Sequence, residues 1–243
     1  MIELAALDMA GTTIDDHGSV YVALTRAVEE TGATVAEADL QQWMGTDKVS
    51  AITALMALGG QAPSEERVAT AFDRFRAILA ESYRDNPPVP LPGVVSALIE
   101  LRTRGVAIVL TTGFSDDVAT PLLESIGWTV GAGDAHLIDA VVTTSAVSAG
   151  RPAPYLIHHA MELSGVRDVR RVVAAGDTIV DLDAARNAGV IAVGVLTGAL
   201  GRAQLESHPH DYIVDSVADL PALLDRLESP IRRIEPDGAS RTK

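Results

Sequence analysis

The sequence lacks cysteine, long apolar runs and any basic stripe, and each absence excludes a class of function. Without cysteine the chain has no disulfides and no thiolate chemistry, which is consistent with a reducing compartment. No apolar run approaches the length of a membrane span, and no signal-peptide pattern precedes the first apolar run, residues 2–7. We therefore expect a cytoplasmic protein without a membrane partner.

Positive charge is scarce and scattered. The chain has 19 basic and 33 acidic residues, a formal net charge of −14, and only two lysines, Lys48 and Lys243. This balance argues against nucleic acid as the main partner. An anionic substrate would need local positive charge, so cationic residues near a predicted pocket are candidates for binding it.

The order of short apolar runs predicts an α/β fold. With 243 residues, of which 47% are hydrophobic, the chain can form a sizeable core in at most two compact units. Aliphatic runs that suit buried parallel strands cover residues 2–7, 106–110, 140–142, 171–175, 191–195 and 212–214. Helical patterns follow at 116–126, 154–164, 181–188 and 217–227. This alternation predicts a doubly wound parallel sheet.

One block interrupts the alternation. Helical patterns at 20–31, 36–44, 48–58 and 64–84 occur with no convincing strand, and a proline-rich linker at 87–93 ends the block. We predict a core domain of residues 1–16 and 91–228, an inserted all-helical cap of residues 17–90, and a flexible tail at 229–243. Residues 15–18 and 87–93 are the expected hinges.

Polar side chains follow the predicted strands where ligands bind in open α/β sheets. Asp8, Thr111, Arg151, Asp177 and Asp181 all lie at or just beyond strand ends. Carboxylate oxygens are the ligands that Mg²⁺ prefers, and a hydroxyl with a guanidinium suits a phosphoryl group. Asp8 could attack phosphorus and form an aspartyl phosphate.

Each of these residues also has an ordinary structural alternative. Asp177 and Asp181 could be solvated acids at a helix start, and Arg151 could be a surface residue before a proline turn. Thr112 competes with Thr111 for the hydroxyl role. Lys48 lies near a predicted helix start, where a solvated lysine is common.

The motifs resemble those of the haloacid dehalogenase superfamily. The segment DMAGTT at 8–13 resembles its first motif, Thr111 its second, and GDTIVD at 176–181 its fourth. Their order, their spacing and the helical insert match over nearly the whole chain. The resemblance implies a hydrolase whose Mg²⁺ is held by Asp8, the Ala10 carbonyl, Asp177 and Asp181.

Two departures narrow the resemblance to the phosphonatase (phosphonoacetaldehyde hydrolase) family. The usual second aspartate of the first motif is Ala10, and the usual third-motif lysine is Arg151. The segment MGTDK at 44–48 is similar to the phosphonatase cap motif that ends in the catalytic lysine. The resemblance implies cleavage of a phosphonoaldehyde, with Asp8, Lys48 and Ala10 at the catalytic centre. It also implies the substrate-binding positions Thr111, Thr112, Gly113, Arg151, Met44, Gly11 and Thr12, and a homodimer formed through the cap.

Ala10 and Lys48 are both expected if the enzyme cleaves a carbon–phosphorus bond instead of a phosphate ester. A phosphate ester leaves as an alkoxide and needs the proton that the missing aspartate would give. A carbon–phosphorus bond needs an electron sink, and a lysine that condenses with an aldehyde supplies one as an iminium ion. The lysine must be partly neutral to react, and burial lowers an ammonium pKa.

One position departs from the phosphonatase pattern. The histidine expected three residues after the cap lysine is Ala51 here, and His17 near the cap entrance is a candidate replacement. A hydroxylated or otherwise altered phosphonoaldehyde is therefore an open alternative as substrate. Two other functions also stay open, a phosphomonoesterase on the same fold and a relative that binds a ligand without turnover.

Overall fold

A computed structural model describes residues 1–131, 133 and 135–228 of the chain. The tail predicted at 229–243 lies outside the described residues. Within them, no helix combines the length and apolar character needed to cross a membrane.

The core is a six-stranded parallel sheet in the order β5-β4-β1-β6-β7-β8. Its strands are β1 (Leu4–Asp8), β4 (Ala107–Thr111), β5 (Ala140–Val142), β6 (Val172–Gly176), β7 (Ile191–Val195) and β8 (Tyr212–Val214). In the centre, Asp8 pairs with Thr111, and Leu7 pairs with Ala175. The predicted α/β sheet with an inserted helical cap is confirmed, and each predicted strand lies within two residues of its observed bounds.

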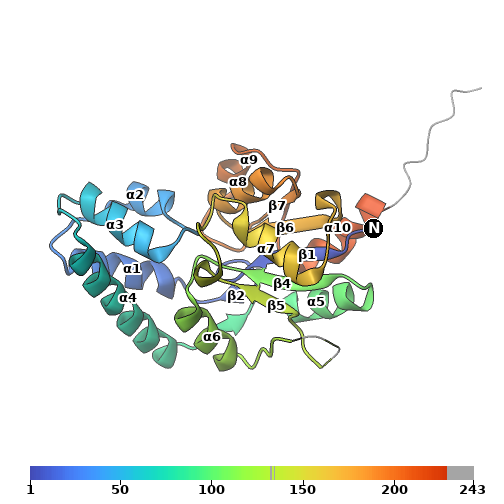
Figure 1. Cartoon of the computed structure of the whole chain (residues 1–243), viewed down its shortest axis with the longest axis horizontal. Helices are drawn as coiled ribbons and strands as arrows, with labels where there is room; N and C mark the ends of the chain where they lie inside the picture. Colours follow the sequence, from blue (N-terminus) through green and yellow to red (C-terminus); the bar gives the residue numbers. More distant parts are fainter. Residues whose placement is uncertain (132, 134, 229–243) are drawn as a thin grey trace, which may run out of the picture.

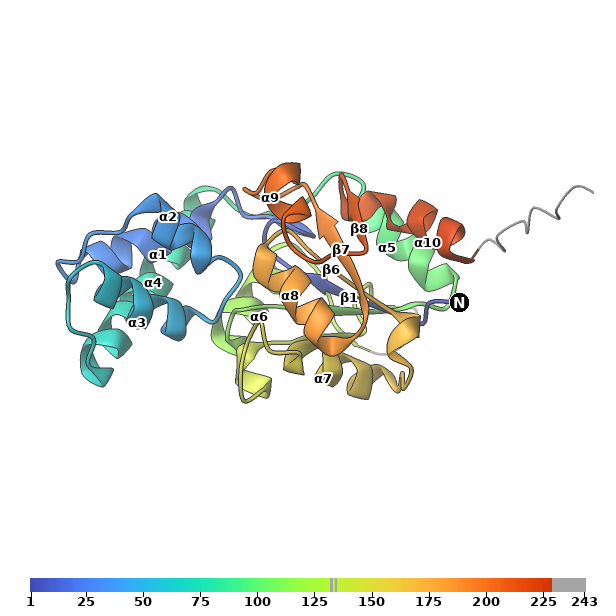
Figure 2. The ribbon, with the colours of Figure 1, turned by 90° about the horizontal axis from the view of Figure 1, so that it is seen from above.

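Helices cover both faces of the sheet because its strands are buried on both sides. Leu4 and Ala6 of β1 pack on one face with α7 (Tyr155–Ser164) and α8 (Ile179–Ala188). Ala5 and Leu7 face the other layer, which includes α5 (Val94–Thr103), α6 (Asp116–Ser125) and α10 (Leu220–Glu228). Figure 2 shows α7 and α8 on one side of the sheet and α5 and α10 on the other. The core also contains the short helix α9 (Arg202–Glu206).

The sequence analysis missed two core helices, α5 and α9. Helix α5 follows Gly93 directly, immediately after the predicted linker at 87–93, and no helix was predicted for its residues. Its buried residues Val94, Ala97, Leu98 and Leu101 nevertheless have helical spacing. Helix α9 is a single short turn and carries little periodicity.

The cap consists of α1 (Ser19–Glu29), α2 (Glu37–Gln42), α3 (Lys48–Leu58) and α4 (Glu65–Asp85). Figure 1 shows these four helices as a bundle beside the sheet, at the end opposite the N-terminus. Helix α1 packs against α3 and α4 through a fully buried set of side chains, which includes Leu24, Ile52, Leu55, Met56 and Phe75.

Two short strands join the cap to the core. Strand β2 (Ile14–Asp15) pairs antiparallel with β3 (Val89–Pro90) where the chain leaves and re-enters the core. The His17 ring lies 3.3 Å, Nε2 to O, from the Pro87 carbonyl. These strands overlap both predicted hinge segments. The domain bounds 1–16, 17–90 and 91–228 stay a prediction.

We expect Leu7→Ala to destabilise the protein by about 2–5 kcal/mol, because Leu7 is fully buried on the central strand. Leu163, which is 53% exposed on α7, supplies the matched control, and Leu163→Ala should change stability by less than about 0.5 kcal/mol. Urea unfolding followed by circular dichroism measures both. A Leu7→Ala loss as small as that of the control would contradict the central position of β1.

Candidate active site

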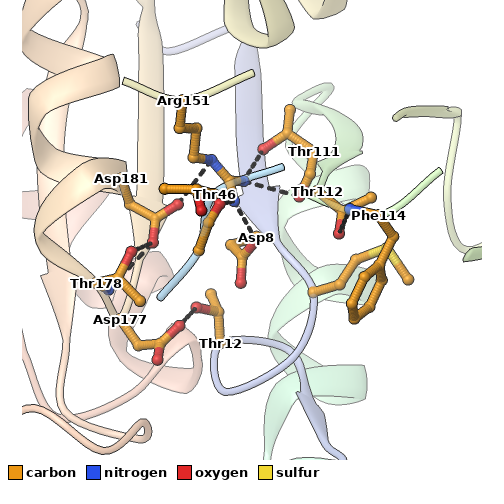
Figure 3. Close-up of polar contacts among 12 residues, drawn as sticks. Asp8, Thr12, Thr46, Thr111, Thr112, Phe114, Arg151, Asp177, Thr178 and Asp181 are labelled. Carbon is orange, nitrogen blue, oxygen red and sulfur yellow. Dashed lines mark hydrogen bonds and ion pairs between the residues drawn. The ribbon is translucent and has the colours of Figure 1, made fainter. Parts of the chain in front are cut away.

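Three buried carboxylates meet at the carboxyl ends of the central strands. Asp8 ends β1, Asp177 follows β6, and Asp181 lies in the first turn of α8. One oxygen from each lies within 4.8 Å of the other two (Figure 3). The positions of these aspartates after predicted parallel strands predict that they meet at one edge of the sheet. The alternative of solvated surface acids is wrong because all three are buried.

The Arg151 guanidinium connects the cluster to the neighbouring strand. It donates to Asp8 Oδ1 at 2.7 Å and to Thr111 Oγ1 at 2.9 Å, and its Nε lies 2.8 Å from Asp181 Oδ1. Arg151 is itself buried, so the alternative of a surface arginine is also wrong. Burial raises the pKa of Asp8 to about 6, although Arg151 limits the rise.

Asp177 has no such cationic partner among the described residues. Its Oδ1 accepts a hydrogen bond from Thr12 Oγ1 at 2.9 Å. Burial raises the pKa of Asp177 well above its ordinary value, and the charges of Asp8 and Asp181 add to the rise. Three carboxylates against one guanidinium leave uncompensated negative charge in a buried site. This donor set fits a hard divalent cation.

The turn after β1 leaves a further oxygen for a metal. The backbone N–H groups of Thr12, Thr13 and Ile14 all donate to the Met9 carbonyl, so the turn makes no use of the Ala10 carbonyl. In contrast, Asp181 also has a structural role. Its Oδ2 accepts from the Thr178 backbone and hydroxyl as a capping box of α8.

Two glycines let the backbone close tightly around Asp177. Gly11 has a φ of +86°, and a Cβ there would lie 2.6 Å from Asp177 Oδ2. A Cβ on Gly198 would lie 1.9 Å from the same oxygen. The loop of Gly198 is tied to the first turn by a hydrogen bond from Thr197 Oγ1 to the Gly11 carbonyl at 2.6 Å. Gly11 was predicted as a site residue, whereas Gly198 was not.

Lys48 begins α3 with its side chain only 4% exposed, so the alternative of a solvated lysine is wrong. Its Nζ donates to the Thr46 carbonyl at 2.8 Å and lies 5.5 Å from the centroid of the Phe114 ring. Burial lowers the pKa of the Lys48 ammonium to about 8, while the charges of Asp8 and Asp47 oppose the shift.

The cap loop that precedes Lys48 packs directly on the core. A Cβ on Gly113 would lie 2.5 Å from the Thr46 carbonyl oxygen, and a Cβ on Gly45 would lie 2.5 Å from Thr178 Oγ1. Gly45 also has a φ of +74°, which favours glycine. The structure thus brings the cap lysine to the side of the core that carries the carboxylate cluster.

The other predicted positions have separate surroundings. Met44 is buried in the cap loop, and Thr112 Oγ1 accepts from the Phe114 backbone N–H at 3.1 Å. Of the two candidate hydroxyls, that of Thr111 is the one that accepts from Arg151. Ala51 is fully buried on α3, and His17 lies at the hinge beside Pro87.

A cleft of about 720 Å³ lies between the cap loop and the segment that carries Arg151. Trp43, Thr46 and Asp47 line it from the cap, and Thr144, Gly150 and Arg151 line it from the core. Asp8, Asp177 and Lys48 do not line this cleft, although Arg151 connects it to the carboxylate cluster.

Comparisons with known proteins agree with this geometry. The haloacid dehalogenase-like hydrolase model matches residues 2–189. A phosphonoacetaldehyde hydrolase from Lactiplantibacillus plantarum is 29% identical over 95% of this chain and 98% of its own length. Another from Lysinibacillus sphaericus is 33% identical over 82% of this chain and 76% of its own length.

Two solved structures share the fold. A phosphonoacetaldehyde hydrolase-like protein from Oleispira antarctica has a TM-score of 0.78 at 23% identity, covering 97% of this chain and 96% of that one. A β-phosphoglucomutase from Clostridium difficile has a TM-score of 0.78 at 18% identity, covering 93% of this chain and 97% of that one. Together with the buried acidic cluster and the cap lysine, the sequence matches show that the chain belongs to the haloacid dehalogenase-like hydrolase family and is a phosphonatase-like hydrolase.

Proposed function

We propose that the protein hydrolyses the carbon–phosphorus bond of phosphonoacetaldehyde or a close phosphonoaldehyde. The observation that carries the proposal is the buried Lys48 amine, which the cap loop holds against the core near the Asp8 cluster. Relatives named phosphonoacetaldehyde hydrolase over nearly the whole chain support the same reaction.

The first step joins the substrate to Lys48. The neutral amine attacks the aldehyde carbon, and loss of water gives a Schiff base whose protonated form is an iminium ion. With a pKa of about 8, roughly a tenth of the amine is neutral at pH 7, whereas an ordinary lysine would have far less.

The second step breaks the carbon–phosphorus bond. The Asp8 carboxylate attacks phosphorus, and the electron pair of the breaking bond moves to the iminium, which becomes a neutral enamine. The phosphoryl group is then on Asp8, and water releases it as phosphate. Protonation and hydrolysis of the enamine release the aldehyde and restore the Lys48 amine.

The remaining site residues bind and orient. Arg151, Thr111, Thr112 and Gly113 hold the phosphonate oxygens, and Gly11, Thr12 and Met44 complete the pocket. A bound Mg²⁺, held by Asp8, the Ala10 carbonyl and Asp177 with Asp181 beside them, would offset the negative charge of phosphonate and carboxylates.

The site gives less support to a phosphomonoesterase. Position 10 is alanine, so the usual acid for a leaving alcohol is missing. Asp16 is a nearby buried carboxylate, but its two oxygens accept from the backbone N–H groups of Gly18 and Val20 at the start of α1. Phosphate release from a panel of sugar phosphates and phosphonoaldehydes separates the two activities.

We expect Lys48→Arg to lower phosphate release from phosphonoacetaldehyde by at least about 10³-fold, because arginine keeps the charge but cannot form the imine. Lys243→Arg, the other lysine of the chain, should keep wild-type activity. Borohydride reduction with substrate should add mass to the peptide that contains Lys48. An active preparation in which that peptide stays unmodified would refute the imine step.

The pKa of Lys48 sets the expected pH dependence of imine formation. The rate of borohydride trapping at low aldehyde concentration should rise about tenfold per pH unit below 8 and level off above it, because the reactive form is the neutral amine. Rapid quenching at pH values from 6.5 to 10 measures this profile. A rate that keeps rising toward pH 10 would show a lysine with ordinary basicity.

We expect Asp177→Asn to weaken Mg²⁺ binding by at least about tenfold, measured by isothermal titration calorimetry. Without metal the variant should be at least as stable as the wild type, since asparagine removes one of three crowded carboxylates. Asp183→Asn, on the same helix as Asp181 but outside the cluster, is the control. Equal Mg²⁺ affinity in both variants would count against a metal held by Asp177.

A further inference from the structure

The Lys48 ammonium is buried with few partners. Among the described residues no carboxylate lies within 4.0 Å of its Nζ, and its hydrogen-bond acceptor is the carbonyl of Thr46, two residues earlier in the same cap loop. A buried charge without a close counter-ion is costly unless other groups stabilise it. The groups around the Lys48 amine therefore determine its position and its protonation.

The Phe114 ring is the short-range partner that comes from the core. Phe114 is 3% exposed, and the Lys48 Nζ lies 5.5 Å from its ring centroid, within the range of a cation–π interaction. Because Lys48 belongs to the cap and Phe114 to the core, this contact exists only where the cap loop is docked.

The backbone fixes the position of Phe114. Its N–H donates to Thr112 Oγ1, and its carbonyl accepts from the Thr144 N–H at 2.9 Å and the Thr144 hydroxyl at 3.0 Å. In Figure 3, Phe114 lies near Thr112, on the side of Asp8 that is opposite to Asp177 and Asp181. The ring is therefore set by the same turn that supplies the proposed phosphonate-binding residues.

We propose that Phe114 is a positioning residue that holds the Lys48 amine in the docked cap and stabilises the cation formed on it. This inference rests on the proposed imine chemistry. The nitrogen of Lys48 is cationic as the ammonium and as the iminium, and neutral as the free amine and the enamine. A ring face favours the two cationic forms, so it supports the iminium that accepts the electron pair of the carbon–phosphorus bond.

A ring suits this position better than a carboxylate. A direct ion pair would hold the proton on the amine more strongly than a ring face does, and so would oppose the attack of the amine on the aldehyde more strongly. The charges that face Lys48 from other elements, Asp8 on β1, Asp16 at the hinge and Arg151 on the core, act over longer distances, and Asp47 lies beside it in the cap loop. The phenyl ring has no ionisable group, so its attraction for the cation does not depend on its own protonation.

The contact can be tested without substrate. In a Lys243→Arg background, ε-¹³C-lysine labelling leaves Lys48 as the one labelled side chain. With Mg²⁺ present, its ε-protons should show an upfield ring-current shift that Phe114→Leu abolishes and Phe114→Tyr retains. Phe75→Leu, which removes a buried ring inside the cap, is the matched control and should leave the shift in place.

The functional part is tested by borohydride trapping with phosphonoacetaldehyde at subsaturating concentration. At pH 9, where the free Lys48 amine is mostly neutral and the ring favours only the iminium, Phe114→Leu should lower the trapped fraction by about fivefold or more, and Phe114→Tyr should stay within about twofold of wild type. Phe114→Met replaces Phe114→Leu if circular dichroism shows that the latter is unfolded.

The two readouts separate the two proposals. A leucine variant with wild-type ε-proton shifts or wild-type trapping would overturn the role of Phe114. A wild-type protein that shows the ring-current shift but forms no adduct would overturn the imine chemistry and leave the Lys48–Phe114 contact standing.

Discussion

The hydrogen-bonded ion pairs of Arg151 are the interaction on which the site depends. One buried guanidinium reaches Asp8 at the end of β1, Asp181 at the start of α8 and Thr111 at the end of β4. Without it, three buried carboxylates would repel one another across the sheet edge. With it, the cluster still holds more negative than positive charge, and among the described residues Asp177 forms no ion pair and accepts its side-chain hydrogen bond from the Thr12 hydroxyl. The same arrangement therefore connects three core elements and leaves a buried acidic cluster whose oxygen atoms could hold the proposed cation.

The second constraint is the close approach of the cap loop to the core. Gly45 and Gly113 lack the Cβ atoms that would collide with Thr178 and with the Thr46 carbonyl. This fit buries Lys48, lowers its pKa and places its amine over the Phe114 ring. Cap docking thus sets both the position and the basicity of the amine, so one contact surface controls two requirements of imine chemistry.

Much of this could be predicted from the sequence because strand ends converge in a parallel sheet. Asp8, Asp177 and Asp181 each follow a short apolar run, and the cap lysine stood out because the chain has so few. Phe114, Thr46 and Gly198 could not be predicted in the same way. Their roles depend on which loops meet in space, and no local pattern encodes the distance from a phenyl ring to an amine 66 positions away. Helix α5 was missed although its own buried residues have a regular helical period.

The central claim is that Lys48 and Asp8 act on opposite ends of one small molecule. The most direct measurement is a crystal structure of the Asp8→Asn variant, which lacks the nucleophile that cleaves the carbon–phosphorus bond, after borohydride reduction with a phosphonoaldehyde and Mg²⁺. We predict continuous density from Lys48 Nζ through the carbon chain to a phosphorus atom that faces the side chain at position 8. A reduced adduct that points away from position 8, or a Lys48 side chain turned out into solvent, would contradict the account.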